Sequence, residues 1–275
     1  MRRADPVAHL VLLCGVLLFA APLWLAFAAS TQPTEAIARG DVSFLPRLDG
    51  FGAYAAVLRE GAPGGGPAWR MLLVSFGMAM TIAGGKIVLS ALSAFAVAFF
   101  RFPGRRLAFW VIFLTLMLPV EVRIIPTFQV MAGLGLVNTF TGLTVPLIAS
   151  ATATLLFRQV FTAVPDELLE AARVDGAGPW RFFWHVLLPV TGANLAALFV
   201  ILFVYGWNQY LWPLLVATDP RLDTVVIGIV KMVGNESVTD WQRVMAATVL
   251  ALLPPVAIVV GMQRWFVRGL TDTEK

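Results

Sequence analysis

The chain has 275 residues, of which 59% are hydrophobic and only 13% are charged. This composition excludes an ordinary soluble domain, in which about a quarter of the residues carry charge. The net charge of +4 does not indicate nucleic-acid binding, because the basic residues gather at the ends of apolar runs. The single cysteine, Cys14, excludes an internal disulfide, and no metal-ligand cluster is suggested. We therefore expect an all-α polytopic membrane protein, because helices satisfy their own backbone hydrogen bonds in lipid.

Six apolar runs are each long enough to cross a hydrocarbon core of about 30 Å as a helix. They cover residues 7–29, 71–100, 107–128, 140–161, 192–216 and 244–266. The first run resembles a secretory signal, but it is longer than a signal core and further runs follow it. We expect it to be retained as a first helix. Residues 1–70 then hold this helix and an outer loop, and residues 71–275 hold a core of five transmembrane helices.

The basic residues predict the orientation of these spans. An even number of spans places both termini on one side of the membrane. The short, strongly basic "RFPGRR" at 101–106 indicates that this side is the cytoplasm. The outer side then carries residues 30–70, with a turn-rich and flexible "GAPGGGP" at 61–67, and residues 217–243. The inner side carries residues 162–191.

The inner segment "AVPDELLEAARVDGAGPWRFFWHVLLP" contains residues typical of the starts and ends of two short helices. Pro165 suits a first helical position, and the acidic residues after it favour the start of a helix. Gly176 is placed to end this helix, because glycine adopts the left-handed conformation at low cost. Pro179 fits the first turn of a second helix, and Pro189 marks its end. By these residues alone, the segment is either a solvated connection or a hairpin made for docking.

One face of the first inner helix favours docking, because it carries small side chains at helical spacing. That face consists of Leu168, Ala171, Ala172 and Asp175. Small alanines there allow another surface to approach closely.

Three elements of the inner segment resemble the "EAA" signature of permease subunits in binding-protein-dependent ABC importers. They are Glu170-Ala171-Ala172, Asp175-Gly176-Ala177 and Leu188-Pro189. The resemblance implies the type I importer permease fold, with six transmembrane helices and cytoplasmic termini. It also implies that the hairpin at 162–191 is the coupling helix, which docks into a groove on a cytoplasmic ATPase subunit.

The resemblance extends from about Trp69 to Lys275 and is to carbohydrate-importer permeases of the maltose type. Within that type it is closest to the permeases of sn-glycerol-3-phosphate importers. The segments that carry it are "WRMLLVSF", "GKIVLSALSAFAVAFFRFP", "TLMLPVEVRIIPT", "ASATATLLFRQ", "YGWNQYLWPLL" and "MQRWFVRGLTDTEK". The chain ends at "GLTDTEK", whereas maltose-type permeases often end in a glycine-rich tail. The outer loop at 217–243 resembles the one that probes the open binding protein in such systems.

The resemblance implies import of sn-glycerol 3-phosphate or related glycerophosphodiesters by alternating access. The implied partners are a second permease subunit, two copies of an ABC ATPase and a periplasmic binding protein, all working at the inner membrane. No Walker A motif is present, since "AGGKI" at 83–87 lacks the first glycine and the Ser/Thr after the lysine. We therefore expect a transport subunit that is not an enzyme and has no cofactor, with ATP and Mg bound by the partner ATPase.

Three charged residues fall inside the predicted spans, where charge is costly and marks function. Lys86 and Glu121 lie at similar depth on adjacent antiparallel spans, which predicts an intramembrane ion pair. Arg123 points to a different helical face and is the better candidate for an anionic substrate, because guanidinium binds phosphate in a forked geometry. The alternative for Arg123 is a side chain that snorkels to the outer interface.

The segment "YGWNQYLWP" at 205–213 is the second candidate for the translocation path. Asn208 and Gln209 are costly in lipid unless paired, so they face either a water-filled path or another helix. Trp207 and Tyr210 form either a lining for a polyol or an interface belt. In maltose-type systems the substrate site can lie wholly on the partner permease. The competing function is an ion-coupled secondary transporter that uses Lys86, Glu121 and Arg123 as a relay.

Overall fold

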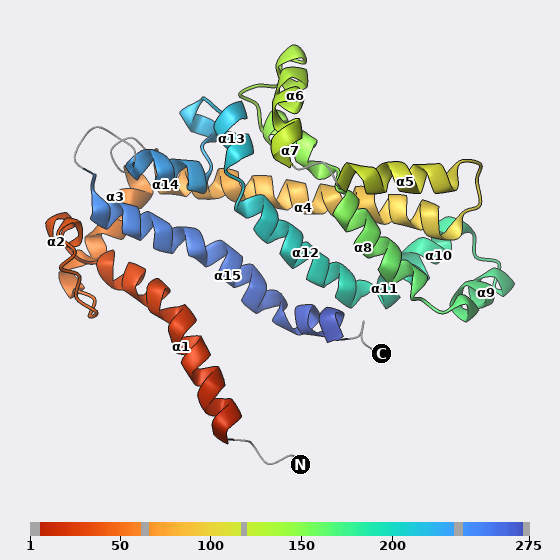
Figure 1. Ribbon diagram of the computed structural model, residues 1–275, viewed down its shortest axis with the longest axis horizontal. Coiled ribbons are helices and arrows are strands. Elements are labelled where there is room, and N and C mark those ends of the chain that lie inside the picture. Colours follow the sequence, from red (N-terminus) through yellow and green to blue (C-terminus); the bar gives the residue numbers. More distant parts are fainter. Residues whose placement is uncertain (1–5, 62–65, 117–119, 234–238, 272–275) are drawn as a thin grey trace. The chain divides into compact units, whose positions relative to one another are not determined.

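The computed structural model describes residues 6–61, 66–116, 120–233 and 239–271 (Figure 1). Every regular element in these ranges is a helix, and none is a strand. The chain divides into two compact units. Unit 1 is Met1–Val74 with Asp223–Pro254, and unit 2 is Ser75–Leu222 with Pro255–Lys275. The division predicted after residue 70 concerns membrane segments and stays a prediction.

Unit 1 holds α1 (Pro6–Ala29), α2 (Thr34–Ala38), the 3-10 turn η1 (Leu48–Phe51), α3 (Gly52–Arg59) and α14 (Val225–Val233). Unit 2 holds α5 (Arg105–Leu116), α6 (Val120–Gly133), α7 (Phe140–Ile148), α8 (Ala151–Thr162), α9 (Asp166–Val174), α10 (Pro179–Phe182), the π turn η2 (Phe183–Leu187), α11 (Leu188–Val190), α12 (Gly192–Trp207), α13 (Leu211–Val216) and the 3-10 turn η3 (Pro220–Leu222). Two long helices, α4 (Ala68–Phe99) and α15 (Trp241–Thr271), contribute residues to both units.

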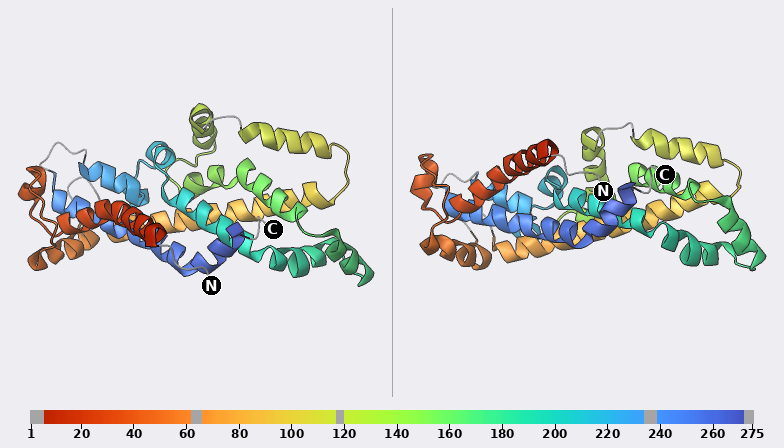
Figure 2. Two further views of the ribbon diagram at one scale, coloured as in Figure 1. Left: turned by 60° about the horizontal axis from the view of Figure 1, so that its bottom comes forward. Right: turned by 90° about the horizontal axis from the view of Figure 1, so that it is seen from below.

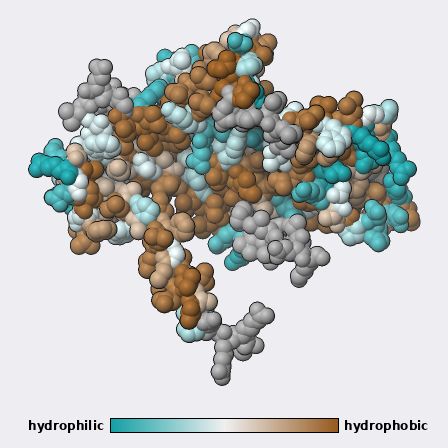
Figure 3. Space-filling view, viewed as in Figure 1, coloured by the Kyte–Doolittle hydropathy of each residue, from teal (hydrophilic) through white to brown (hydrophobic). Residues whose placement is uncertain are grey.

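Three single helices of the described part are long and apolar enough to cross a membrane: α1, α4 and the Trp241–Trp265 part of α15. Two bent pairs raise this number to five if each pair is one span, namely α7 with α8 and the Pro179–Val190 segment with α12. The side chains along α1 are almost all exposed and hydrophobic, and its surface is brown in Figure 3. Such a helix needs lipid or another helix to cover it.

The third predicted span, residues 107–128, is divided between α5 and α6, and residues 117–119 lie outside the described part. With 12 and 14 residues, neither helix alone reaches the length of about 20 residues that a span requires. The fifth predicted span, residues 192–216, is wrong as one helix, because α12 ends at Trp207 and α13 begins at Leu211. A total of six spans and the cytoplasmic placement of the termini therefore stay predictions.

The fourth predicted span is bent rather than straight. α7 and α8 meet at 46°, and the break falls at Ala149, whose backbone is extended. Ser150 then starts α8 as its N-cap, with its hydroxyl accepting a hydrogen bond from the Ala153 N–H at 3.3 Å. A serine cap allows a new helix to begin at once, because it satisfies one of the free amides of the first turn.

The segment at 30–61, predicted to lie outside, is folded within unit 1, and Arg243 at the start of α15 anchors it. The Arg243 guanidinium contacts Glu60 at 3.5 Å and donates to the Gly61 carbonyl at 2.9 Å. Thr34 adds a hydrogen bond to Asp240 at 2.8 Å. Of the predicted flexible stretch at 61–67, residues 62–65 lie outside the described part.

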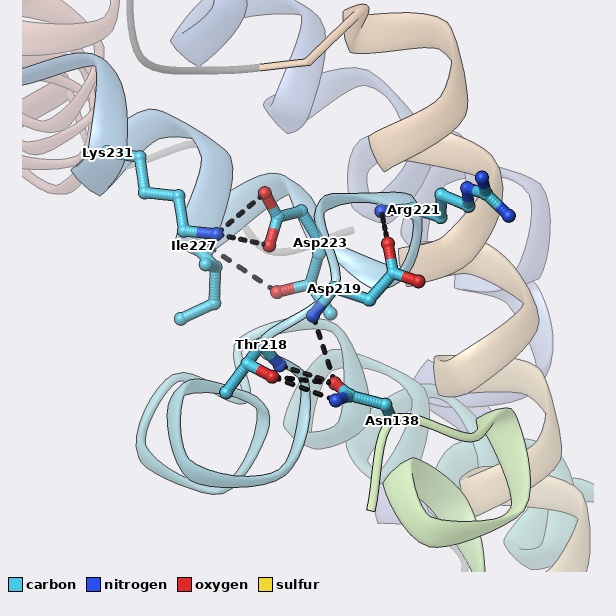
Figure 4. Close-up of polar contacts among 8 residues, drawn as sticks. Asn138, Thr218, Asp219, Arg221, Asp223, Ile227 and Lys231 are labelled. Atoms are coloured by element: carbon cyan, nitrogen blue, oxygen red, sulfur yellow. Dashed lines mark hydrogen bonds and ion pairs between the residues drawn. The ribbon is translucent and has the colours of Figure 1, made fainter. Parts of the chain in front are cut away.

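α14 is a helix that the sequence did not predict in the loop at 217–243, and an ion pair fixes it. The Lys231 ammonium lies 2.7 and 2.9 Å from the two oxygens of Asp223 (Figure 4). The Asp223 side chain is 1% exposed, whereas that of Lys231 is 34% exposed.

Because the carboxylate is the buried partner, Lys231→Met is expected to lower the free energy of unfolding by about 3 kcal/mol. Thermal unfolding in detergent measures this loss. The matched control is Arg47→Met, which removes an exposed pair with Asp49 at 2.8 Å and should leave the unfolding temperature almost unchanged. Equal effects of the two substitutions would contradict a structural role for the Lys231–Asp223 pair.

The core of unit 2 next to α9 is aromatic. Its buried members are Ala91, Ala94, Phe95, Phe157, Phe161, Ala172, Phe182, Phe183, Leu187 and Leu198. They come from α4, α8, α9, α10, η2 and α12, so one cluster joins the inner hairpin to three longer helices. α5 also packs against α8, as the views in Figures 1 and 2 agree.

Candidate functional site

The segment at 162–191, predicted to lie inside, forms the predicted hairpin of two helical arms. α9 is the first arm, and its first turn carries Asp166 and Glu167 at the positive end of the helix dipole. The helix begins one residue later than predicted, at Asp166. Pro165 is its N-cap residue, with φ of −57° and ψ of 138°, rather than its first helical residue.

Gly176 ends α9 in the left-handed conformation, with φ of +72°. The Ala177 N–H donates to the Ala172 carbonyl at 2.8 Å, and the Gly176 N–H donates to the Arg173 carbonyl at 3.0 Å. These two bonds form a Schellman motif, which satisfies carbonyls that the end of the helix leaves free. The helix-ending position predicted for Gly176 is therefore confirmed.

The predicted small-residue face of α9 is divided between the protein core and the surface. Ala172 is buried in the aromatic core of unit 2, where its methyl group lets α9 lie close to its neighbours. Ala171 and Asp175 of this face are exposed, and Leu168 is half-buried. Glu170, beside them, is also exposed. Val174 joins them with 88% of its surface accessible, although it is aliphatic. One side of the hairpin tip thus holds α9 to the chain, while the other presents a small, partly apolar patch.

The second arm begins at Pro179, as predicted, and continues further than predicted. Pro179 is the first residue of α10, and the helix widens into the π turn η2 before Pro189. A proline ring collides with the carbonyl four residues earlier in a regular α-helix, and a wider turn relieves this collision. The arm ends one residue after Pro189, and the chain then bends by 76° into α12.

Lys86 lies in the middle of α4, and its ammonium faces an aromatic ring. The side chain is only 5% exposed, and Nζ lies 3.6 Å from the centre of the Tyr205 ring on α12. A ring face attracts a cation through its quadrupole, more strongly where water is excluded. Arg123, on α6, is a second cation of the same unit. Two cations in one unit favour the approach of an anion.

The predicted Lys86–Glu121 pair stays a prediction, because the Glu121 side chain lies outside the described part. Arg123 is exposed, as a residue on an accessible path requires. Tyr205, the aromatic partner of Lys86, was not predicted as a site residue, although it lies in "YGWNQYLWP". Its position three residues before Asn208 places the two on neighbouring turns of one helix face, which was the available signal.

The chain breaks between α12 and α13 at residues 208–210, where the second candidate group lies. Asn208 and Tyr210 are exposed, and the Gln209 side chain donates to the Tyr205 carbonyl at 3.1 Å. Trp207 is buried and stacks on Phe203 with ring centres 6.0 Å apart, so it packs the core instead of lining a path. Broken helices at membrane depth are tolerated where they line a cavity or are covered by protein.

Asn138 fastens the turn before α7 to the segment after α13, and the sequence did not indicate it. Its φ is +58°, and its side-chain oxygen accepts from the backbone N–H groups of Thr218 at 2.7 Å and Asp219 at 2.9 Å (Figure 4). Its amide donates to the Thr218 hydroxyl at 2.8 Å. The only signal was the residue type, since asparagine tolerates the left-handed conformation.

Asn138→Ala removes these bonds and places alanine in left-handed backbone, so we expect a loss of about 2 kcal/mol in unfolding free energy. Thermal unfolding of the purified chain measures the loss. Asn138→Asp keeps the accepting oxygen and should retain most of the stability, whereas Asn138→Gly keeps only the backbone conformation. If all three variants unfold at the same temperature as the unmodified chain, the hydrogen bonds of Asn138 contribute nothing to stability.

Comparison with known proteins gives concordant results. Residues 86–272 match the family described as "Binding-protein-dependent transport system inner membrane component". The sn-glycerol-3-phosphate transport system permease protein UgpE of Yersinia pestis is 52% identical over 276 residues, which cover 100% of this chain and 98% of the relative. The protein of the same description from Agrobacterium fabrum is 52% identical, with 99% and 98% covered.

Among solved structures, the chain resembles one chain of a bacterial ABC transporter involved in the import of the acidic polysaccharide alginate. The TM-score is 0.80, with 97% of this chain and 99% of that chain covered. At 23% identity this likeness shows the fold alone. The match to the transport family covers more than half of the 275 residues. With its several apolar helices, the chain is a multi-pass protein of the inner membrane. It belongs to the family of inner-membrane components of binding-protein-dependent transport systems.

Proposed function

We propose that the chain is a permease subunit of an ATP-driven importer of sn-glycerol 3-phosphate. The observation that carries this proposal is the 52% identity to permeases of that system over the whole length of both chains. Membership of a binding-protein-dependent family favours ATP-driven transport over the ion-coupled alternative, which has no need of such a partner. Glycerophosphodiesters share the phosphate group and remain within the same substrate class.

The positive charges inside unit 2 support an anionic substrate. The Lys86 ammonium is held over the Tyr205 ring, and Arg123 is a second, exposed cation on another helix. A glycerol phosphate that passes between these helices exchanges its hydration shell for a lysine point charge and a forked guanidinium. Asn208, Gln209 and Tyr210 at the helix break are proposed to contact the glycerol hydroxyls. Trp207 is left out of this lining because it is buried against Phe203.

The hairpin is proposed to transmit the movement of the ATPase. Its exposed patch at Glu170, Ala171, Val174 and Asp175 docks on the ATPase, while Ala172 ties α9 to the aromatic core. That core is continuous with α4, α8 and α12, so displacement of the hairpin displaces the helices that carry Lys86 and Tyr205. Close-packed side chains pass such movements on because they have no space in which to absorb them.

α4 and α12 are in close contact near the proposed path. A Cβ added at Gly206 would lie 3.0 Å from the Ala79 Cα, so the two backbones approach as closely as glycine allows. We propose that these helices move as one body during alternating access. The remaining partners are a second permease subunit, two ATPase copies that bind ATP and Mg, and a periplasmic binding protein. Six spans with cytoplasmic termini complete the proposed arrangement, and the chain itself holds no cofactor and catalyses no reaction.

The substrate is tested by uptake into proteoliposomes that contain the complete importer with its binding protein and ATP. Labelled sn-glycerol 3-phosphate should accumulate, and unlabelled glycerophosphocholine should compete more strongly than maltose. Competition by maltose but not by glycerophosphates would overturn the assignment to a phosphorylated substrate.

A further inference from the structure

Four arginines converge on a pocket at one end of unit 2, away from Lys86 and the helix break. The pocket has a volume of ≈ 790 Å³ and lies between the end of α4, the turn into α5, and α8. Its lining includes Arg101, Arg105, Arg106 and Arg158, together with the rings of Phe109 and Trp110. None of the described residues that line it is acidic. The pocket therefore concentrates positive charge around an open space.

The charges in this pocket lack counter-charges within the described part of the chain, where none of the four arginines forms an ion pair. The Arg158 guanidinium lies over the Phe109 ring at 4.7 Å, and its buried Nε has no hydrogen-bond partner. Arg105 donates only to the Phe100 carbonyl, at 3.3 Å. A buried donor without a partner costs free energy, and a ligand that accepts a hydrogen bond removes this cost.

The start of α5 adds positive potential from the backbone. Arg105 and Arg106 are its first two residues, and its first turn contains no acidic residue. The positive end of a helix dipole normally attracts acidic side chains and repels basic ones. Two arginines at this end are unfavourable unless an anion binds there, where free backbone N–H groups also point.

An apolar stripe leads away from the pocket along the same helix. Leu107, Trp110, Val111 and Leu114 follow helical spacing, and each is more than half exposed. Figure 3 shows hydrophobic surface over α5 next to the hydrophilic surface of the turn that precedes it and of α9. A cationic pocket followed by an apolar stripe matches the two parts of a phospholipid, with the headgroup phosphate in the pocket and an acyl chain along α5.

We propose that this pocket binds the headgroup of an anionic phospholipid. The guanidinium groups donate hydrogen bonds to the phosphodiester oxygens, whose negative charge is not offset by an ammonium in such a headgroup. A zwitterionic headgroup fits less well, because its ammonium meets four like charges.

The same site touches the hairpin. Arg101 and Arg105 also line a second pocket of ≈ 930 Å³ under α9, together with Asp166 and Glu170. A lipid that binds these two arginines offsets their positive charge beside the acidic residues of α9. The bound lipid therefore changes the electrostatic potential at the hairpin, which links anionic lipid to coupling.

Native mass spectrometry of the full-length chain in mild detergent tests the proposal independently of transport. The probes are phosphatidylglycerol and phosphatidylcholine of equal chain length, with inorganic phosphate and sn-glycerol 3-phosphate as soluble competitors. Phosphatidylglycerol should bind preferentially. The double variant Arg106→Gln/Arg158→Gln should bind it about tenfold to thirtyfold more weakly, since each arginine near an anionic surface is worth about 1 kcal/mol.

The control is Arg264→Gln, which removes one positive charge from an exposed position on α15, outside the pocket, and should bind phosphatidylglycerol normally. If the glutamine variant does not fold, Arg158→Lys is used in its place, because it keeps the positive charge but loses the guanidinium. Equal binding of the two lipids, or unchanged binding by the double variant, overturns the proposal. Displacement of the lipid by either soluble phosphate identifies a free-phosphate site and also overturns it. If the double variant no longer binds the ATPase but still binds phosphatidylglycerol, the pocket is a protein contact, and the proposal is also overturned.

Discussion

Gly176→Ala is expected to lower ATP-driven uptake about fivefold to thirtyfold while leaving the chain folded and inserted. Gly176 has φ of +72°, where a residue with a Cβ costs about 1–2 kcal/mol, and this amount changes a population about fivefold to thirtyfold. The cost is conformational, because a Cβ at this position would meet no atom within 4 Å. The turn that orients the docking patch is therefore destabilised without any clash. Uptake per importer complex in proteoliposomes measures the effect.

Gly178→Ala is the matched control for this prediction. Gly178 lies two residues further on and also has free space at its Cβ, but its φ of −69° and ψ of 167° suit any residue. Its uptake should equal that of the unmodified chain. Gly176→Asn should recover part of the rate, because asparagine tolerates the left-handed region. A normal rate for Gly176→Ala, with the ATPase still bound, would show that this turn has no part in coupling.

Lys86→Met and Arg123→Gln are each expected to weaken substrate transport about tenfold to a hundredfold. A hydrogen bond to a charged group contributes about 1.5–3 kcal/mol, and each 1.4 kcal/mol is a factor of ten. Methionine fills the space of the lysine stem in a site that is only 5% exposed, so the loss is of charge rather than of packing. The measured quantity is the dependence of uptake on the concentration of sn-glycerol 3-phosphate.

Three further variants separate a substrate role from a structural one. Tyr205→Phe keeps the ring beneath the Lys86 ammonium and should transport normally, whereas Tyr205→Leu should resemble Lys86→Met. Arg70→Gln removes a positive charge from an exposed position near the start of α4 and serves as the charge control. If Lys86→Met and Arg123→Gln transport as well as Arg70→Gln does, the two cations do not meet the substrate.

Features that depend on local chemistry could be predicted from the sequence. Gly176 and Pro179 act through their own backbone preferences, so the hairpin turn followed from residue type and spacing. The first, second and sixth spans were also recognisable, because an uninterrupted apolar run of this length has few other uses. The start of α9 was predicted at Pro165, one residue before its observed start, which is within the usual uncertainty of a helix end.

Features that depend on contacts between distant segments could not be predicted. The break at Ala149 and the one at residues 208–210 fall inside apolar runs that read as continuous helices, and packing decides where such runs bend. α14 is a short apolar run of nine residues, a length that fits helix and strand equally well. The contact of Lys86 with Tyr205 joins α4 to α12, and no local pattern marks it. The Asn138 clamp was missed for the same reason, since its partners follow α13.

The division of Ala171 and Ala172 shows the same limit within one motif. Spacing placed both alanines on one face of α9, and adjacent helical residues point about 100° apart. Only the position of the aromatic core decides that Ala172 is buried and Ala171 is free to meet a partner. The motif was therefore recognisable, whereas the assignment of its residues to docking or packing required the structure.

The central claim is that this chain moves substrate only when a separate ATPase acts on its hairpin. The direct measurement is uptake of labelled sn-glycerol 3-phosphate into proteoliposomes, with and without the ATPase subunits, under ATP and under an imposed proton or sodium gradient. We predict uptake only when the ATPase subunits and hydrolysable ATP are both present, with no response to either gradient. Gradient-driven uptake by the permease without the ATPase would contradict the account.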